Sequence, residues 1–262
     1  MKIALIGYGK MGHLIHEIAT ERGHEVVCIV DPNITVDKAP NPTFPPKGNE
    51  NESALCEADV AIEFSTPATA ADNIRMAWEA GVPVVSGTTG WDIEELRIKN
   101  EELRLKEVAP NGGSLKFISE GSSTKVVDTS GKVWLVWKSN FSVGVNVFFE
   151  LNKELAALLA PYSQYTPSIT ETHHIHKLDK PSGTAVTLKE GIQEAPNPAF
   201  PREGKEIGKG QEIPIESIRE GEVAGIHTVT WDSEEDTITI THSAKSRRGF
   251  ALGAVLAAEQ LL

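Results

Sequence analysis

The stretch that decides the fold of the first half is KIALIGYGKMG, residues 2–12. Its apolar run from Lys2 to Ile6 ends in a glycine, as a buried parallel strand does before a turn. Apolar residues then recur at helical spacing, at Met11, Leu14, Ile15, Ile18 and Ala19. Gly23 is placed to end this helix, and Glu25 to Val30 predicts a second strand that stops at Asp31.

The order of strand, glycine loop, helix, strand and acidic residue is typical of a dinucleotide-binding unit. Gly7 permits the tight turn, Gly9 lets the backbone approach a pyrophosphate, and Gly12 lets the helix pack closely on the strand. Asp31 is placed to accept hydrogen bonds from the adenosine ribose. A strand–turn–helix with a purely structural role is the alternative.

The residues after Asp31 bear on which nucleotide binds. Pro32 and Asn33 follow, so a ribose 2′-phosphate would meet a carboxylate with no arginine beside it. We therefore expect NADH to bind at least as well as NADPH, and Lys38 is the residue that would overturn this. Residues 33–51 are rich in Pro, Asn and Lys, and predict an irregular surface loop.

Two further strands are predicted, from Asp59 to Phe64 and from Val82 to Ser86. The first ends in Ser65-Thr66-Pro67 and the second in Gly87-Thr88-Thr89-Gly90. The segments of interest are Phe64 to Thr66 and Gly87 to Thr89. Ligands bind at the carboxyl ends of the strands in open α/β sheets, so we expect these two segments to line the nicotinamide. The alternative is that they are only turns of small residues.

Helices are predicted between and after these strands. Ala68 to Ala80 places three apolar side chains on one face and is ended by Gly81. These side chains are Ala71, Ile74 and Trp78. Asp92 is placed to cap a helix that runs to about Lys106.

Residues 109–132 are dominated by Asn, Gly, Ser, Thr and Lys, and predict an insertion, either a surface hairpin or a mobile loop. A strand from Trp134 to Trp137 and a helix from Val145 to Leu159 are predicted after it. The helix offers four side chains to a core: Phe148, Phe149, Leu155 and Leu158.

The second half is organised around ETHHIHKLDKPSGTA, residues 171–185. Three histidines and a lysine fall within five positions: His173, His174, His176 and Lys177. A strand from Ser168 to His174 leads into this stretch, and a helix from Ala185 to Ile192 follows it. Histidine suits proton transfer near neutral pH, and the free amides of a helix N-terminus suit a carboxylate. The stretch therefore predicts a site that binds an acidic small molecule and moves a proton.

A metal site is one alternative, because the three histidines with Asp179 offer ligands that zinc accepts. Adjacent histidines on a regular strand point to opposite faces, so His173 and His174 cannot both ligate easily. A solvated loop without a role is the other alternative.

Three runs after the second helix alternate with period two: residues 213–219, 225–231 and 237–242. The last two flank a hairpin connection, and together the runs predict an antiparallel sheet whose exposed face pairs with copies of the chain. A closing helix carries Phe250, Ala254, Ala258 and Leu261.

The predicted fold class is α/β, with a Rossmann-like parallel-sheet domain at residues 1–141 with 246–262. The predicted second domain, at residues 142–245, is α+β with a mostly antiparallel sheet, and serves substrate binding and oligomerisation.

Composition narrows the class of protein. The chain has 262 residues, of which 40% are hydrophobic, enough for a sizeable core. Its 37 acidic and 25 basic residues give a net charge of −12, a poor match for nucleic acid or an anionic membrane. Cys28 and Cys56 provide no disulfide framework, and no apolar run is long enough for a signal peptide or a membrane span. We expect a soluble, cytoplasmic protein.

These motifs occur in an order that resembles one known family. They are GYGKMG at 7–12, GTTG at 87–90, SNFSVGVN at 139–146 and HHIHKLDKPSGTA at 173–185, continued by ITH at 240–242 and by Arg247, Phe250 and Ala251. Over nearly its whole length, except roughly 109–132, the chain resembles the 4-hydroxy-tetrahydrodipicolinate (dihydrodipicolinate) reductases of lysine and diaminopimelate biosynthesis.

The resemblance implies NADH- or NADPH-dependent reduction of a cyclic dicarboxylate imine, or its hydrated form, by a homotetramer built through the antiparallel sheet. It implies that His173 is the proton donor and that Lys177 is a second catalytic group. The implied substrate contacts are His174, Ser182, Gly183 and Thr184. The implied cofactor contacts are Gly7, Tyr8, Gly9, Lys10, Met11, Gly12, Asp31, Gly87, Thr88, Thr89, Lys138, Ser139, Asn140 and Phe141. No metal is implied.

Two features depart from the family. The span from Gly90 to Ser139 is longer than usual, and Lys138 stands where small residues are commoner. An insertion that folded over the cleft would alter access, whereas an inert surface excursion would not. A metal-dependent hydrolase, a related reductase of another acidic substrate and a non-catalytic nucleotide-sensing protein are the rival interpretations.

Overall fold

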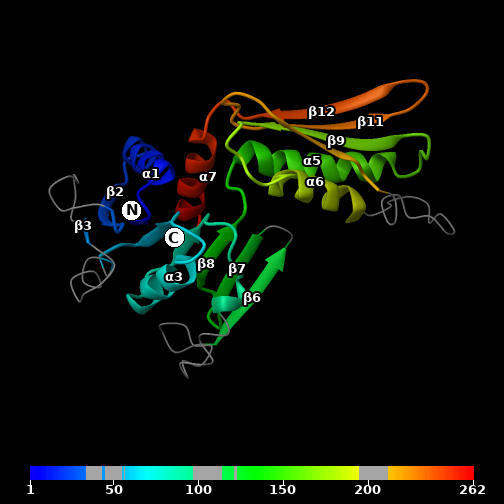
Figure 1. Cartoon of the computed structure of the whole chain (residues 1–262). Coiled ribbons are helices and arrows are strands. Elements are labelled where there is room, and N and C mark those ends of the chain that lie inside the picture. The colour runs from blue at the N-terminus through cyan, green and yellow to red at the C-terminus, as the bar shows by residue number, and fades with distance from the viewer. Residues whose placement is uncertain (34–42, 45–54, 56, 97–113, 121–122, 195–211) are drawn as a thin grey trace. The chain divides into compact units, whose positions relative to one another are not determined.

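The computed structural model describes residues 1–33, 43–44, 55, 57–96, 114–120, 123–194 and 212–262 (Figure 1). The chain divides into two compact units, Met1–Ser142 with Phe250–Leu262 (unit 1) and Val143–Gly249 (unit 2). Ser142 and residues 246–249 thus fall on the other side of the expected division.

Unit 1 is built on an eight-stranded sheet with the strand order β3-β2-β1-β4-β5-β8-β7-β6. The strands are β1 (Lys2–Ile6), β2 (Glu25–Val30), β3 (Thr43–Phe44), β4 (Val60–Glu63), β5 (Val84–Ser86), β6 (Leu115–Glu120), β7 (Ser123–Asp128) and β8 (Val133–Lys138). Strands β1 to β5 and β8 run parallel, and β6 and β7 are antiparallel additions. The predicted Rossmann-like sheet is confirmed, and β3 is a short strand within the segment predicted to be all loop.

The segment predicted as an insertion loop at 109–132 forms a hairpin in its described part. Strand β7 pairs with β8, so the hairpin extends the main sheet and is not a loop standing off it. Val126 and Asp128 point inward from β7, and Asp128 Oδ2 accepts a hydrogen bond of 3.0 Å from Trp134 Nε1 on β8. Of the two interpretations of this segment, the hairpin is confirmed in the described part, although its polar composition masks the period-two alternation of the strands.

Within the part of unit 1 that the structure describes, three helices cover the two faces of this sheet: α1 (Lys10–Glu21), α3 (Ala70–Glu79) and α7 (Arg248–Glu259). α1 and α7 share one hydrophobic core, in which Ile15 and Ile18 join Ala254 and Val255. Figure 1 shows these helices side by side, in blue and red, and Arg22 Nε binds Glu259 Oε1 at 2.7 Å across them. α3 belongs to the second core of unit 1, where its predicted apolar face, Ala71, Ile74 and Trp78, is buried.

The predicted ends of helices α1 and α3 are confirmed. Gly23 and Gly81 follow them with φ of 81° and 80°, a conformation that favours glycine. Asp92 Oδ1 accepts the N–H of Glu94 at 2.9 Å, as the predicted cap requires. The rest of that predicted helix, most of the loop at 33–51 with Lys38, and residues 195–211 lie outside the described residues.

Unit 2 contains a four-stranded sheet with the order β10-β9-β11-β12. Its elements are α5 (Val143–Leu159), β9 (Thr166–His173), α6 (Gly183–Glu194), β10 (Ile215–Arg219), β11 (Ile226–Asp232) and β12 (Thr237–Ser243). The mostly antiparallel sheet is confirmed for β9, β11 and β12. For β10 the antiparallel prediction is wrong: it runs parallel to β9, because α6 forms the crossover that parallel neighbours need.

One face of this sheet carries the core of unit 2. Phe148 and Phe149 of α5 and Leu188 of α6 pack there with Ile169 of β9 and Trp231 of β11. In Figure 1 both helices lie on the same side of the strands. The prediction that Leu158 joins this core is wrong, since its side chain is 68% exposed.

Candidate functional site

The glycine loop of unit 1 lies where the strand order reverses, between β1 and β4. A Cβ on Gly7, whose φ is 89°, would come within 2.6 Å of the Phe64 carbonyl carbon and 2.9 Å of Ser65 Cα. A Cβ on Gly12 would overlap the Gly7 carbonyl oxygen. On Gly9, at the start of α1, it would meet nothing within 4 Å among the described residues. The loop is therefore closed where the backbone packs and open at Gly9, which fits a pyrophosphate at a helix N-terminus.

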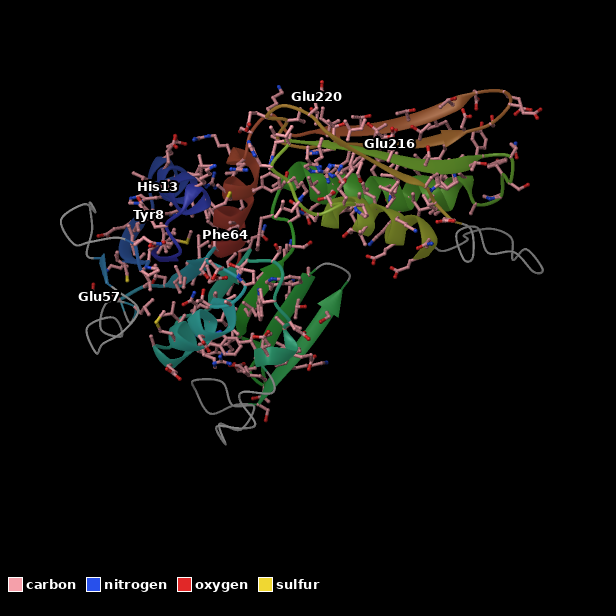
Figure 2. All side chains as sticks on the ribbon, viewed as in Figure 1. Tyr8, His13, Glu57, Phe64, Glu216 and Glu220 are labelled. Atoms are coloured by element: carbon pink, nitrogen blue, oxygen red, sulfur yellow. The ribbon has the colours of Figure 1, made fainter. Side chains whose placement is uncertain are left out.

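Asp31 is fixed by backbone groups. Its Oδ2 accepts the Tyr8 N–H at 2.7 Å and its Oδ1 accepts the Asn33 N–H at 2.8 Å. A carboxylate has about four acceptor positions, so it keeps capacity for ribose hydroxyls. Beside the same loop the Tyr8 ring lies against that of His13 in a tilted arrangement, with the ring centroids 4.1 Å apart; both residues are labelled in Figure 2. The residues present thus fit the adenosine half of a dinucleotide.

Glu63, at the end of β4, organises the two segments expected to line the nicotinamide. Its fully buried carboxylate accepts the Ser65 N–H at 2.9 Å and the Thr88 hydroxyl at 2.8 Å on Oε1. Its Oε2 accepts the Ser86 hydroxyl at 2.6 Å. Thr88 Oγ1 also accepts the Ser65 N–H at 2.9 Å. The ends of β4 and β5 are therefore tied to each other through one carboxylate that the sequence analysis did not single out.

The segment after β8 is anchored within unit 1. Phe141 is buried, its ring lies 6.1 Å from that of Phe64, and a Cβ on Gly253 of α7 would overlap its carbonyl oxygen. Asn140 Oδ1 accepts the Ser142 N–H at 2.9 Å. Lys138 is half-buried, and burial, then the charge of Lys125, lowers its pKa.

These contacts join the ends of β1, β2, β4, β5 and β8, and among the expected cofactor residues they involve Gly7, Tyr8, Gly12, Asp31, Thr88, Asn140 and Phe141. Gly9, Lys10, Thr89 and Ser139 are exposed around them, and Met11 is half-buried on α1.

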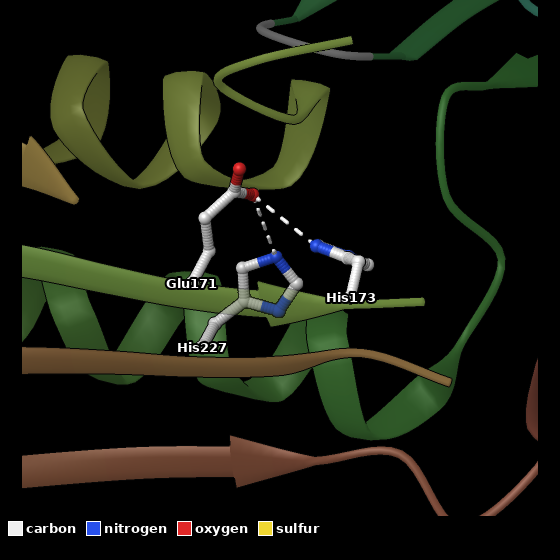
Figure 3. Close-up of side chains that lie close together, drawn as sticks. All are labelled: Glu171, His173 and His227. Carbon is white, nitrogen blue, oxygen red and sulfur yellow. Dashed lines mark ion pairs between the residues drawn. The ribbon is translucent and has the colours of Figure 1, made fainter. Parts of the chain in front are cut away.

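In unit 2, side chains of the histidine stretch form a buried cluster with a side chain from a strand distant in sequence (Figure 3). Glu171 and His173 lie two residues apart on β9 and point to the same face. The register of β11 on β9 places His227 directly opposite Glu171. His173 Nδ1 lies 3.5 Å, and His227 Nε2 3.8 Å, from Glu171 Oε2. We call Glu171, His173 and His227 the Glu–His–His cluster.

Glu171 is 0% exposed but well supplied with donors. The Ser182 N–H lies 3.1 Å from both of its oxygens, and Arg219 Nη2 lies 3.1 Å from Oε1. Burial raises the pKa of this carboxyl, but hydrogen bonds from Ser182, Ser217 and Arg219 outweigh burial and lower it to about 2. Glu171 is therefore an anion at neutral pH.

The two histidines of the cluster are shifted towards the neutral form. Burial lowers the pKa of His173; Glu171 opposes this, and the net shift is downward. Burial, and then the charge of His173, lower the pKa of His227 to about 4. The rings meet edge to face with their centroids 4.9 Å apart.

The other predicted residues surround this cluster at the start of α6. Lys177 Nζ pairs with Asp179 Oδ1 at 2.8 Å. Ser182 is buried, and its hydroxyl accepts the Ala185 N–H at 3.2 Å, so it caps α6. Gly183 is exposed and Thr184 half-buried in the first turn of the same helix, and His174 is half-buried at the end of β9.

The histidines that the sequence offered for zinc do not converge. His176 is exposed and lies 3.3 Å from Glu222, and Asp179 pairs with Lys177. Within the described residues, the group with metal-ligand spacing is the Glu–His–His cluster, whose donor atoms lie within 4.8 Å of one another. Because Ser182 and Arg219 already bind the oxygens of Glu171, this arrangement favours a buried ion-pair network over a metal site.

Two family models match this chain, one in each half. The family model described as dihydrodipicolinate reductase, N-terminus, matches residues 1–108, and the model described as dihydrodipicolinate reductase, C-terminus, matches residues 144–262. The chain belongs to the dihydrodipicolinate reductase family. The span between the two matches holds the β6–β7 hairpin and β8.

Full-length relatives agree with this. The chain is 40% identical to the 4-hydroxy-tetrahydrodipicolinate reductase of Christiangramia forsetii, over 100% of this chain and 92% of that protein. It is 34% identical to the reductase of the same name from Staphylococcus aureus, over 100% of this chain and 95% of that one. The dipicolinate-bound dihydrodipicolinate reductase from Paenisporosarcina sp. TG-14 shares the fold, with a TM-score of 0.64 at 22% identity, over 100% of this chain and 94% of that chain.

No helix in the described ranges combines the length and apolar character needed to cross a membrane.

Sequence reasoning missed Glu171, Arg219 and His227 as members of the site, and Glu63 in unit 1. A signal for two of them was present. Glu171 precedes His173 by two residues, so both point to one face of a strand. His227 stands on the apolar face of its strand, with Val229 and Trp231, where a polar residue needs a partner.

Proposed function

We propose that this chain reduces 4-hydroxy-tetrahydrodipicolinate to tetrahydrodipicolinate with NAD(P)H, in lysine and diaminopimelate biosynthesis. The observation that carries the proposal is that the N-terminal and the C-terminal family models of dihydrodipicolinate reductase both match this one chain. The geometry supports it: unit 1 has a nucleotide-type glycine loop, and unit 2 has a buried histidine, a lysine and a helix N-terminus within one motif.

The reaction needs three things from the protein. Loss of the 4-hydroxyl as water leaves a ring double bond conjugated with the imine. A hydride added to that double bond leaves an enamine-like anion, and a proton on the neighbouring carbon completes the reduction. The protein must hold a nucleotide, hold a dicarboxylate and deliver one proton.

Unit 1 would hold the nucleotide. Gly9 and the start of α1 take the pyrophosphate, and Asp31 takes the adenosine ribose. The segments around Ser65 and Thr88, joined through Glu63, line the nicotinamide end with Lys138 to Phe141. Bound there, the dihydronicotinamide supplies the hydride. We expect NADH to serve at least as well as NADPH, because Asp31 would repel a 2′-phosphate and no arginine follows it.

Unit 2 would hold the dicarboxylate. The amides of Gly183 and Thr184 in the first turn of α6 suit one carboxylate. Lys177 suits a carboxylate too, and would exchange Asp179 for it or share both. His174 and Ser182 complete the proposed contacts, Ser182 by holding the start of α6 in place.

His173 would deliver the proton. Only the imidazolium form can do so and leave a neutral ring. Burial lowers the pKa of His173, so the free enzyme holds it largely neutral at neutral pH. A bound dicarboxylate brings negative charge to the ring and raises that pKa, so proton uptake would accompany substrate binding.

We further propose a homotetramer assembled through the sheet of unit 2. One face of that sheet carries α5 and α6, and the strands leave the other face to a partner. Light scattering during size-exclusion chromatography tests this directly: a mass of four chains supports it, and a monomer excludes it.

The decisive assay follows NADH absorbance after freshly prepared 4-hydroxy-tetrahydrodipicolinate is added. His173→Ala and Lys177→Ala are expected to bind NADH like the wild type and to lose turnover by about 10²- to 10⁴-fold. His176→Ala is the matched control, because that exposed ring lies in the same motif outside the cluster. Unchanged turnover in the first two variants would remove both residues from the mechanism. NADH binding without any wild-type turnover would favour another acidic substrate or a sensing role.

A further inference from the structure

We propose that Glu171 is a positioning residue for His173: its fixed carboxylate receives Nδ1 of the ring and supports the ring's positive charge, so that Nε2 delivers the proton. This inference rests on the proposed function, in which His173 is the proton donor, and adds a residue that acts on the substrate only through His173.

Glu171 has the fixed geometry that this role needs. It is buried at the base of the cluster, and Ser182 from the start of α6 and Arg219 from β10 bind its two oxygens. β10 is paired with β9 and α6 packs on one face of the sheet, so the carboxylate cannot turn away without breaking contacts to both elements. A buried anion held by charge-assisted hydrogen bonds is a stable reference point for a neighbouring ring.

The His173 ring is bounded on three sides. Figure 3 marks its Nδ1 facing Glu171 Oε2. The two atoms lie 3.5 Å apart, and Nδ1 has no hydrogen-bond partner within the described residues. On the Nε2 edge, a Cβ on Gly225 would lie 3.2 Å from Nε2, and Gly225 has a φ of 147°, which favours glycine. The ring of His227 stands against it edge to face. Gly225 therefore leaves Nε2 room that any larger residue would take.

Burial and four neighbouring charged side chains set the pKa of His173. Burial has the largest effect and disfavours the imidazolium. Two anions oppose burial, Glu171 on β9 and Asp179 in the following turn. Two cations reinforce it, Lys177 in that turn and Arg219 on β10, while His227 on β11 stays neutral near pH 7. Of the two anions Glu171 has the larger effect on the pKa of His173, so without it the ring loses its main support for a positive charge.

A structural role for Glu171 alone makes a different prediction. Glu171→Gln keeps the size and an acceptor for Ser182 and Arg219, but removes the charge. If Glu171 only held α6 and β10 together, the variant would be less stable, yet its pH profile would parallel that of the wild type. If Glu171 supports the imidazolium, the profile must move.

The experiment measures kcat against pH for the wild type, Glu171→Gln and Glu171→Asp. In Glu171→Gln the pKa of His173 falls further, so the falling limb of the profile moves to lower pH by about one unit or more. The deficit is about tenfold at neutral pH, narrows as pH falls, and leaves the KM for NADH unchanged. Glu171→Asp retains the charge and restores part of the profile. Parallel profiles overturn the inference.

A wild-type measurement covers the case in which Glu171→Gln does not fold. Nitrogen NMR of the neutral His173 ring is expected to show the proton on Nδ1, where Glu171 accepts it; a proton on Nε2 overturns the inference. The proposed function is tested separately by His173→Ala. If that variant keeps full turnover, the proposed function fails; if it is inactive while Glu171→Gln has a parallel profile, only this inference fails.

Discussion

Two separate variants, Gly9→Ala and Gly12→Ala, distinguish the packing of the nucleotide loop from its role in binding the nucleotide. At Gly9 the backbone has φ −78° and ψ −156°, which alanine adopts without strain, and the new Cβ meets nothing within 4 Å in the described part of the chain. At Gly12 the new Cβ overlaps the Gly7 carbonyl oxygen and lies 3.2 Å from its carbon. The first change adds bulk to open space, and the second pushes α1 off the end of β1.

The magnitudes follow from these surroundings. Gly12→Ala forces backbone to move against backbone, and overpacking of this kind costs about 1–3 kcal/mol of unfolding free energy. In Gly9→Ala a poorer helix cap is offset by a less flexible unfolded chain, so stability changes by less than about 1 kcal/mol. The methyl nevertheless occupies the approach of the pyrophosphate, and NADH affinity falls by about tenfold or more, which is roughly 1.4 kcal/mol.

Two assays read the two effects apart. Urea unfolding gives the stability of each variant, and NADH fluorescence titration gives the dissociation constant. The reasoning is refuted if Gly9→Ala binds NADH like the wild type, or if Gly12→Ala unfolds at the wild-type urea midpoint. The first result would mean that the pyrophosphate does not approach Gly9, and the second that α1 does not pack tightly on the end of β1.

Three further outcomes are expected. Asp31→Ala should weaken NADH more than NADPH, measured as two dissociation constants; equal losses would discredit the ribose contact. Glu63→Gln should raise the KM for NADH and cost about 1–3 kcal/mol of unfolding free energy, because the buried Ser86 and Thr88 hydroxyls lose one of the two acceptor oxygens; wild-type values would exclude that role. The pKa of His227 is lowered from 6.5 to about 4. As pH falls between these values, the unfolded chain binds a proton that the folded chain does not bind, which favours unfolding. The wild type should therefore lose up to about 3 kcal/mol between these pH values, and His227→Gln should lose much less; equal slopes in urea melts would contradict this.

Much of the fold follows from local sequence. The run before Gly7, the helical spacing after it and the acidic stop at Asp31 each depend on neighbouring residues, so they predict the first strand, helix and strand directly. The strands of the β6–β7 hairpin are harder to predict, since Ser123 and Lys125 on its outward positions and Thr124 on its buried face mask the apolar alternation. The direction of β10 depends on a crossover that no local pattern reveals.

The candidate site divides in the same way. His173, Lys177 and the start of α6 stand in one motif, so the sequence places them together. The Glu–His–His cluster depends on strand register: His227 faces Glu171, and Arg219 faces His173, across pairs that are far apart in the chain. Shifting either pairing by two residues would keep the same apolar face and dissolve the cluster, and a single sequence cannot choose between such registers.

The reductase assignment itself is tested most directly by following the hydrogen. NADH carrying deuterium at both C4 positions of the nicotinamide is incubated with the enzyme and 4-hydroxy-tetrahydrodipicolinate, and the product is analysed by mass spectrometry. The account predicts tetrahydrodipicolinate with one deuterium per molecule, formed in step with NADH oxidation. A product without deuterium, or no product while NADH remains bound and unoxidised, would contradict it.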